Sequence, residues 1–219
     1  MKTPTTRLTS TDRRQQILDQ ATKLFARRGY EGTTTRQIAR QAGINEALIF
    51  RHFGDKDGLY WAIIEQKCQM GARRAKLMQT LDSRSDDRTI LATLAETVLR
   101  RNFEDSSLAR LLLFSALENH RLSRRFFRVY VAQNYDSIAA YIRRRVRQGK
   151  FRGVDAQLAA RGFLGMVVYH FWIQEIFGGK RFQKFDLKKV SNTLADIWLR
   201  GMRSSPSERS RQEARKSLK

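Results

Sequence analysis

The stretch from Thr34 to Lys56, TTRQIARQAGINEALIFRHFGDK, constrains the fold more than any other part of the sequence. A TxxQ capping box at Thr34 predicts the start of a helix. Gly43 predicts its end, because glycine adopts a positive φ without steric cost, and Asn45 is suited to cap a second helix over residues 46–52. Two short helices joined by a tight glycine turn form a helix-turn-helix motif.

Each of the two predicted helices has an apolar side and a polar side. Ile38, Ala39 and Ile49 would face inward, with Ala39 small enough to let the helices cross closely. A helix that lies in a DNA major groove carries short or hydrogen-bonding side chains. The outward positions of the second helix are Asn45, Glu46, Ala47, Arg51 and His52. The pattern indicates a DNA-reading unit, and a helical hairpin that only caps a bundle is the alternative interpretation.

The charge of the chain favours a polyanionic partner. Lysine and arginine number 43 against 21 aspartate and glutamate residues, which gives a formal net charge of +22. Such an excess favours nucleic acid first and an anionic membrane surface second. The 219 residues are 41% hydrophobic, which is enough for a real core. The single cysteine, Cys68, excludes an internal disulfide and a cysteine-cluster zinc site, and it fits a reducing compartment.

No targeting segment is recognisable in the sequence. The first eleven residues lack the apolar run of a signal peptide, and no stretch approaches the ~20 apolar residues of a membrane span. We therefore expect a cytoplasmic, nucleoid-associated protein with no membrane partner. Residues 1–11 are predicted to be a flexible N-terminal arm. Residues 204–219 are predicted to be a disordered basic tail, because they have no apolar period.

Helices are also predicted on both sides of the motif. Thr9 and Asp12 give another capping signature, followed by an apolar stripe that ends at Gly29, so a first helix should brace the motif. A long fourth helix should begin near Lys56. The free N–H groups at a helix start favour an anion, so Lys56 would help to hold a DNA phosphate there, and a solvated lysine is the alternative.

The first sixty residues resemble the N-terminal domain of TetR/AcrR-family helix-turn-helix transcriptional regulators. The positions that carry the resemblance are Ile17, Leu24, Phe25, Gly29, Tyr30, Gly43, Phe53, Lys56 and Leu59. The resemblance implies phosphate contacts from Thr34, Thr35, Arg36, His52 and Lys56. It implies base or groove contacts from Asn45, Glu46, Ala47, Phe50 and Arg51. Phosphate contacts give affinity, whereas base contacts give sequence choice.

Phe50 departs from the family pattern, which commonly has a tyrosine at this position. A phenyl ring cannot donate a hydrogen bond to a phosphate, so Phe50 would contact a thymine methyl group or a sugar, or simply pack. Glu46 would accept from a cytosine amino group but repel phosphates, which makes it a selector of sequence rather than a source of affinity.

The remaining sequence predicts only helices, so the fold class is all-α. We expect a three-helix DNA-binding head at residues 12–57 and a larger helical effector-binding and dimerisation domain at residues 58–203. About nine helices are expected in total. Those after the fourth span about residues 90–105, 107–120, 123–148, 155–177 and 186–202.

The segment from Asp155 to Phe177 is apolar almost all around its helix, so a second copy of the chain should cover one of its faces. In the resembled family, the last two long helices of each subunit form a four-helix dimer interface. The predicted interface residues are Gly162, Phe163, Met166, Trp172, Ile176, Leu194, Ile197 and Trp198. Two heads roughly 34–36 Å apart would read a near-palindromic operator on double-stranded DNA.

The resemblance also implies a small-molecule effector, with no other cofactor, bound in the second domain and coupled to the head through the fourth helix. An effector acts only if it binds the DNA-incompetent state better. Candidate lining residues are Phe114, Phe127, Tyr130, Asn134, Met166 and His170. An aromatic stripe at helical spacing is otherwise plain core. The expected function is a repressor released by its ligand, although no residue distinguishes a repressor from an activator.

Two other function classes, an enzyme and a sequence-independent DNA-binding protein, are the alternatives to a regulator. The sequence has three histidines, one cysteine and none of the HExxH, P-loop, dinucleotide-turn or nucleophile-elbow motifs, so we expect no enzyme and no metal site. The high charge also fits a sequence-independent nucleoid or architectural DNA-binding protein. The arginines at 143–147 are explained either by a solvated helix end or by an acidic partner, an acidic effector or extra DNA contact.

Overall fold

The computed structural model describes residues 9–118 and 121–203. Within these ranges most residues are helical, and β structure is confined to one isolated bridge between Phe151 and Arg203. The all-α prediction is confirmed. The described residues fall into two compact units, one within Met1–Met70 and Ser107–Phe126, the other within Gly71–Ser106 and Phe127–Lys219. The tail predicted at 204–219 and most of the predicted arm, residues 1–8, lie outside the described residues.

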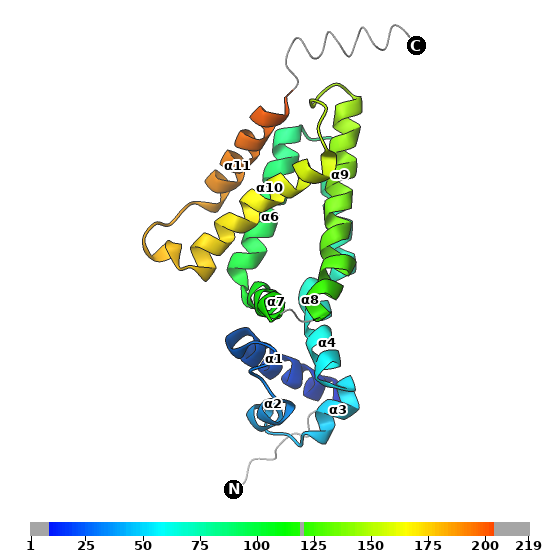
Figure 1. The fold of residues 1–219 in the computed structure, drawn as a ribbon, viewed down its shortest axis with the longest axis vertical. Coiled ribbons are helices and arrows are strands. Elements are labelled where there is room, and N and C mark those ends of the chain that lie inside the picture. The colour runs from blue at the N-terminus through cyan, green and yellow to red at the C-terminus, as the bar shows by residue number, and fades with distance from the viewer. Residues whose placement is uncertain (1–8, 119–120, 204–219) are drawn as a thin grey trace. The chain divides into compact units, whose positions relative to one another are not determined.

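Six helices build the first unit (Figure 1). They are α1 (Ser10–Arg28), α2 (Thr35–Ala42), α3 (Ala47–Phe53), α4 (Lys56–Cys68), α7 (Ser107–Leu117) and α8 (Arg121–Phe126). The unit therefore extends past the head expected at residues 12–57. It includes α4 and two helices from the middle of the chain, because α7 packs on both α1 and α4.

The core of the first unit is aliphatic with a small aromatic cluster. The ring of Phe25 stacks on that of Tyr30 at 5.8 Å, and both meet the ring of Tyr60 edge to face, at 5.0 and 5.3 Å. Such offset and edge-to-face pairs are favourable beyond the area that they bury. The aliphatic residues of this unit that are fully buried include Ile17, Leu18, Ile38, Ile49, Leu59, Ile63 and Ile64.

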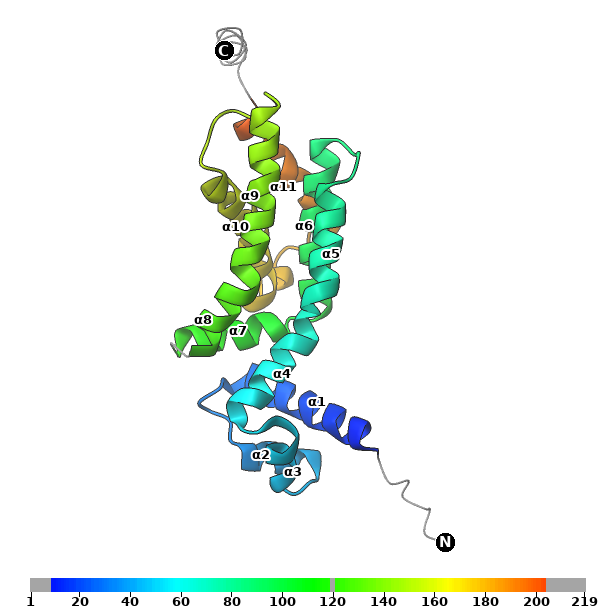
Figure 2. The same cartoon turned by 90° about the vertical axis from the view of Figure 1, so that its right-hand side faces the viewer.

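The second unit is a helical bundle (Figures 1 and 2). Its elements are α5 (Met70–Leu81), α6 (Asp87–Glu104), η1 (Phe127–Val131), α9 (Ala132–Arg147), α10 (Ala156–Phe171), η2 (Trp172–Ile176), η3 (Gly179–Arg181) and α11 (Leu187–Met202). Here η1 and η2 are π-helical turns and η3 is a 3₁₀ turn. α6 packs against α10 and α11, and α10 also packs against α9. Trp198 lies edge to face against the rings of Phe151 and Phe163, at 5.6 and 5.7 Å.

Two of the nine expected helices are each divided into two α-helical segments, which accounts for the eleven such segments of the described chain, and a third ends in a π-helical turn. The long fourth helix ends at Cys68, because Gln69 adopts a left-handed conformation with φ of 42°, and the chain restarts as α5. The helix expected over residues 123–148 runs from Arg121 to Arg147 but contains the π-helical turn η1. The helix expected at 155–177 likewise changes to π-helical geometry at Trp172.

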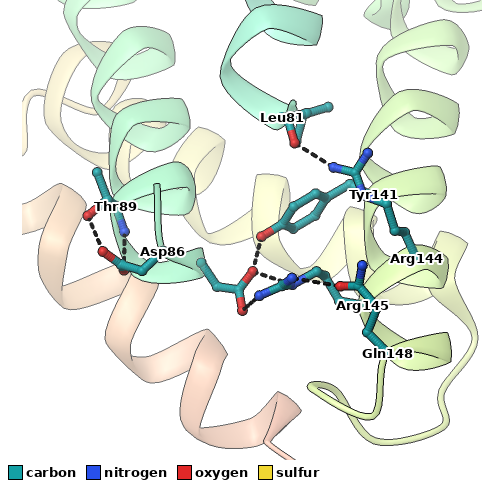
Figure 3. A network of polar contacts seen from close by, with 8 residues as sticks. Leu81, Asp86, Thr89, Tyr141, Arg144, Arg145 and Gln148 are labelled. Atoms are coloured by element: carbon teal, nitrogen blue, oxygen red, sulfur yellow. Dashed lines mark hydrogen bonds and ion pairs between the residues drawn. The ribbon is translucent and has the colours of Figure 1, made fainter. Parts of the chain in front are cut away.

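A polar network ties the end of α9 to the α5–α6 connection (Figure 3). Asp87 accepts hydrogen bonds from Tyr141 Oη and from Arg145 Nη2, the latter at 2.7 Å. Arg144 donates to the carbonyl oxygen of Leu81 at 2.6 Å and to the carboxylate of Asp82 at 2.8 Å. Burial and the Asp87 carboxylate raise the pKa of Tyr141, so its hydroxyl stays a donor. Two arginines of the 143–147 cluster therefore hold the second unit together.

Candidate nucleic-acid interface

The caps at the start of α2 form as the sequence predicts. Thr34 Oγ1 accepts from the backbone N–H of Gln37 at 3.2 Å, and the Gln37 side chain accepts in return from the Thr34 N–H at 3.0 Å. This reciprocal pair satisfies two N–H groups that a helix start leaves free. Gly43 ends α2 in a left-handed conformation with φ of 62°. The helix-turn-helix geometry is therefore set largely by local sequence.

The second helix of the motif, α3, runs from Ala47 to Phe53, one residue later than expected. Asn45 Oδ1 accepts from the backbone N–H of Ala47 at 2.9 Å, so Asn45 caps the start of this helix. Ile49 is fully buried, which fixes the face of α3 that packs inward. Asn45, Ala47, Phe50 and Arg51 are exposed, and Phe50 is 46% exposed.

The sequence predicts that α1 braces the motif, and two of its residues, Arg14 and Gln16, make supporting contacts that the sequence does not indicate. Gln16 Nε2 donates at 2.9 Å to the carbonyl oxygen of Ala42, which the end of α2 leaves without a helical partner. The Arg14 guanidinium lies 5.0 Å from the ring centre of Phe53, a cation–π contact with the last residue of α3. These contacts join positions 26 and 39 residues apart, so no local pattern reports them.

The predicted phosphate contacts are not all presented in the same way. Thr34 and Arg36 are exposed at the start of α2. His52 is half-buried, and its Nε2 is buried with no hydrogen-bond partner among the described residues, so only Nδ1 remains to reach a phosphate. Thr35 Oγ1 donates a hydrogen bond of 2.5 Å to Glu46 Oε1, so a predicted phosphate contact and a predicted base contact are paired with each other.

Lys56 is the first residue of α4, as predicted, but its side chain is not fully solvated. Its Nζ lies 4.0 Å from the ring centre of Tyr30. Burial lowers the pKa of Lys56, and the carboxylates of Glu31, Glu118 and Asp57 act in the opposite direction. At the same helix start, Asp55 accepts from the N–H of Gly58 at 2.6 Å. A side chain therefore already occupies part of the anion-binding position expected there.

The candidate effector residues divide between the two units. Phe114 belongs to the first unit, whereas Phe127, Tyr130, Asn134, Met166 and His170 belong to the second. Phe127 is 47% exposed. Tyr130 Oη accepts from Arg101 at 3.2 Å, and the ring of His170 meets those of Phe103 and Phe185 edge to face, at 6.4 and 5.6 Å. Their assignment as pocket residues stays a prediction.

The candidate dimer residues include two that the core uses. Phe163 is fully buried and Trp198 is 8% exposed. Their rings pack against each other, and Trp198 Nε1 donates at 3.1 Å to the carbonyl oxygen of Ala159. This corrects the expectation that both side chains face a second copy. Ile197, at 56% exposed, and Trp172, at 36%, do lie on the surface.

The described residues show neither a metal-binding cluster nor a membrane span. Across the ranges 9–118 and 121–203, histidine, cysteine, aspartate and glutamate nowhere gather into a set of three that could hold an ion. Every described helix is too short or too polar to cross a membrane.

Two family models match most of the chain. Residues 17–63 match the model described as bacterial regulatory proteins of the tetR family. Residues 88–201 match that of the C-terminal domain of AefR-like transcriptional repressors, and this match alone spans more than half of the 219 residues. The chain belongs to the TetR family. As a TetR-family transcriptional regulator, it has the helix-turn-helix head and helical C-terminal domain predicted from the sequence.

Individual relatives of this TetR-family chain are similar to it over different lengths. The transcriptional regulator HbdR of Aromatoleum sp. strain CIB is 46% identical over 54 residues, which are 25% of this chain and 24% of the relative. The match thus spans about a quarter of that protein. The nucleoid occlusion factor SlmA of Vibrio campbellii is 29% identical over 165 residues, 72% of this chain and 81% of the relative.

A solved structure shares the fold of this TetR-family chain. The transcriptional regulator FadR from Bacillus subtilis, in complex with stearoyl-CoA, matches with a TM-score of 0.66 and 20% sequence identity. The match covers 84% of this chain and 97% of that chain. At this identity the likeness shows the fold.

Proposed function

We propose that this TetR-family regulator is a homodimeric repressor that binds a near-palindromic operator and is released by a small-molecule effector. The observation that carries the proposal is the outer side of α3. Ile49 anchors the helix in the core, whereas Asn45, Ala47 and Arg51 stay exposed. A short helix with one anchored side and one hydrogen-bonding side is what major-groove reading requires.

A surface on α10 and on the first residue of η2 supports the homodimer. Leu158, Gly162, Gly165, Tyr169 and Trp172 recur every three or four residues, and all five are exposed. A Cβ atom added at Gly162 or Gly165 would meet nothing within 4 Å, so a second helix has room to approach the backbone closely. Leu158 is 65% and Tyr169 62% exposed, which is costly for apolar groups unless another surface covers them.

A neighbouring surface on α11 extends the proposed interface. Ile197 is 56% exposed, and Gly201 is exposed one turn further on, with nothing within 4 Å of an added Cβ. The opposite side of α11 holds Ala195, Trp198 and Leu199 in the core. Each of the last two long helices thus has a core side and an unpaired side, the arrangement that a four-helix interface between two copies uses.

The repressor and effector parts of the proposal rest on the comparisons. The C-terminal domain matches a model of transcriptional repressors, and the structurally similar FadR holds stearoyl-CoA. The candidate residues Tyr130 and His170 are half-buried in the second unit, where a polar hydroxyl and an imidazole could orient a ligand. Release then requires that the ligand bind the DNA-incompetent state more tightly.

The decisive experiment is selection from random duplex DNA by the purified protein at near-physiological salt, followed by sequencing of the bound fraction. Enrichment of an inverted repeat would support dimeric, sequence-specific recognition. A distinct outcome would support another function. Measurable binding with a steep salt dependence and no enriched sequence would favour a sequence-independent nucleoid or architectural DNA-binding protein. This is the second candidate function because of the net charge of +22 and the likeness to SlmA.

A further inference from the structure

A carboxylate from the middle of the chain fills the turn after α1. Glu118 accepts from the backbone N–H of Tyr30 at 3.1 Å and from that of Glu31 at 3.4 Å. Consecutive backbone N–H groups directed at one anion form a small anion-binding turn. Gly29 ends α1 with φ of 76°, a conformation that favours glycine, and a Cβ atom at this position would lie 2.3 Å from Glu118 Oε1 and so displace the carboxylate.

A second contact reaches the start of α4. Arg121 Nε donates at 2.6 Å to Asp57 Oδ2, and Tyr30 Oη donates to the other oxygen of the same carboxylate. Asp57 lies in the first turn of α4, where a negative charge is favourable, and its side chain is only 16% exposed. The Tyr30 phenol keeps its proton, because burial and the Asp57 carboxylate raise its pKa.

These contacts lie at the two ends of the segment that carries the DNA-reading helices α2 and α3. The turn at Tyr30 and Glu31 leads into α2, and Asp57 follows the end of α3. Glu118 and Arg121 therefore hold both the entry and the exit of α2–α3, across 64 to 88 positions of sequence. Further contacts seat the same segment: Tyr60 Oη donates to the Leu111 carbonyl oxygen at 2.6 Å, and the Arg125 guanidinium lies 3.8 Å from the ring centre of Trp61.

The segment that carries these groups is joined at both ends to the second unit. The chain enters α7 from α6 and leaves α8 without a break into η1 and α9, and both α6 and α9 belong to the second unit. A change in either helix thus has a covalent path to Glu118 and Arg121. An exposed ion pair alone contributes little, but two contacts at the two ends of one short motif restrict its orientation.

We propose that Glu118 and Arg121 are positioning residues that clamp the entry and exit of α2–α3, and so set the half-site spacing that the protein accepts on DNA. This inference rests on the proposed function, because spacing has meaning only for two heads on one operator. A conformational change caused by an effector can act on the DNA-reading helices by breaking these contacts. Loss of the contacts would leave the residues of α3 unchanged but would let the α2–α3 segment change its orientation.

The test compares the spacing preference of the full-length protein with that of Glu118→Gln and Arg121→Gln. The matched controls are Glu104→Gln and Arg128→Gln, which change the net charge equally at exposed positions. Each protein selects from duplexes that contain the enriched half-site twice with randomised spacer length. We expect both clamp variants to accept a wider range of spacers and to bind the preferred one about fivefold more weakly, the scale of one ordinary hydrogen bond lost at a partly exposed site. The controls should match the wild type.

Hydrogen exchange of the Tyr30 and Glu31 amides gives a readout independent of DNA. Exchange should be faster in Glu118→Gln than in Glu104→Gln, with thermal unfolding recorded for every variant. An unchanged spacer range in both clamp variants would overturn the proposal. It would also be overturned if each clamp variant lost the same affinity at every spacer length, and if this loss were proportional to its loss of thermal stability. If the wild-type protein enriches no inverted repeat, the proposed function fails. This failure is distinguishable from failure of the clamp proposal, because it is measured on the wild-type protein alone.

Discussion

Thr35 Oγ1 donates a hydrogen bond to Glu46 Oε1 at 2.5 Å, which links the first residue of α2 to the residue before α3. The pair spans the turn of the helix-turn-helix motif. It gives Glu46 a role in holding the two helices together, in addition to the sequence choice predicted for it. It also means that the Thr35 hydroxyl is directed toward a carboxylate rather than toward a phosphate.

Thr35→Val removes this donor while keeping the shape of the side chain. We expect the free energy of unfolding to fall by about 1 kcal/mol, the usual contribution of one hydrogen bond. DNA affinity should fall for all duplexes, because α3 is less firmly held. Thr193→Val, at an exposed position of α11, is the control for the chemical change. Urea unfolding and DNA titration that show Thr35→Val equal to Thr193→Val would contradict the role of the pair.

Arg51→Ala should change which sequence is preferred. Arg51 is exposed in the last turn of α3, and a bidentate arginine–guanine contact is worth about 1–3 kcal/mol of discrimination. Selection from random duplexes should therefore lose information at one position of each half-site and keep the rest. Arg143→Ala, an exposed arginine of the second unit, should keep the wild-type motif. An unaltered motif from Arg51→Ala would refute the assignment.

Asn45 needs a more careful substitution, because it both caps α3 and is a predicted base contact. Asn45→Asp keeps an oxygen that can accept from the Ala47 N–H but removes the amide donor. We expect little change in the unfolding midpoint and a changed base preference. Asn45→Ala should lose both the cap, at a cost of about 1 kcal/mol, and the base contact. Equal motifs from the wild type and Asn45→Asp would remove Asn45 from the base-reading set.

Lys56→Ala should weaken binding to every duplex alike and lower the slope of log affinity against log salt by about one unit. The contact between Lys56 Nζ and the Tyr30 ring makes a small loss of stability expected as well, about 0.5–1 kcal/mol. Lys150→Ala removes the same charge from an exposed site in the second unit. If the salt slope of Lys56→Ala equals that of Lys150→Ala, Lys56 makes no phosphate contact.

Ile197→Asp should convert the protein to a monomer without unfolding it. Ile197 is 56% exposed, so a charge there disturbs the core little, but it would be buried in the proposed interface of α10 and α11. Sedimentation equilibrium should show one copy, and operator affinity should fall with it. Met78→Asp, at a 40% exposed position of α5, is the control. An intact Ile197→Asp dimer would place the interface elsewhere.

The unfolding free energy should fall as the pH decreases through about 6.5, in part because of His170. Burial lowers the pKa of His170 from its ordinary value of 6.5, so the folded protein resists a proton that the unfolded chain accepts. Protonation therefore favours the unfolded state at lower pH. His170→Gln, which cannot be protonated, should show a smaller fall between about pH 7 and pH 5 in chemical denaturation. Superimposable pH profiles would contradict this prediction.

The sequence determined most of what depends on neighbouring residues. The capping boxes at Thr9 and Thr34 form with the predicted partners, and Gly29, Gly43 and Gly149 all adopt the positive φ that ends a helix or turns the chain. These features need only groups three or four positions apart, so a linear pattern contains all their information. The same density of local signals made the family resemblance of the first sixty residues recognisable, and the family matches confirm it.

Only the tertiary structure decided which residues far apart in the sequence pack against or hydrogen-bond to one another. An apolar stripe shows that Phe163 and Trp198 are buried somewhere, but not whether their own core or a second copy buries them, and the fold assigns both to the core. Glu118 and Arg121 carry no local signal at all, because their partners lie 64 to 88 residues away. Burial and long-range hydrogen bonds depend on which helices meet, and that depends on the packing of the entire unit rather than on any one segment.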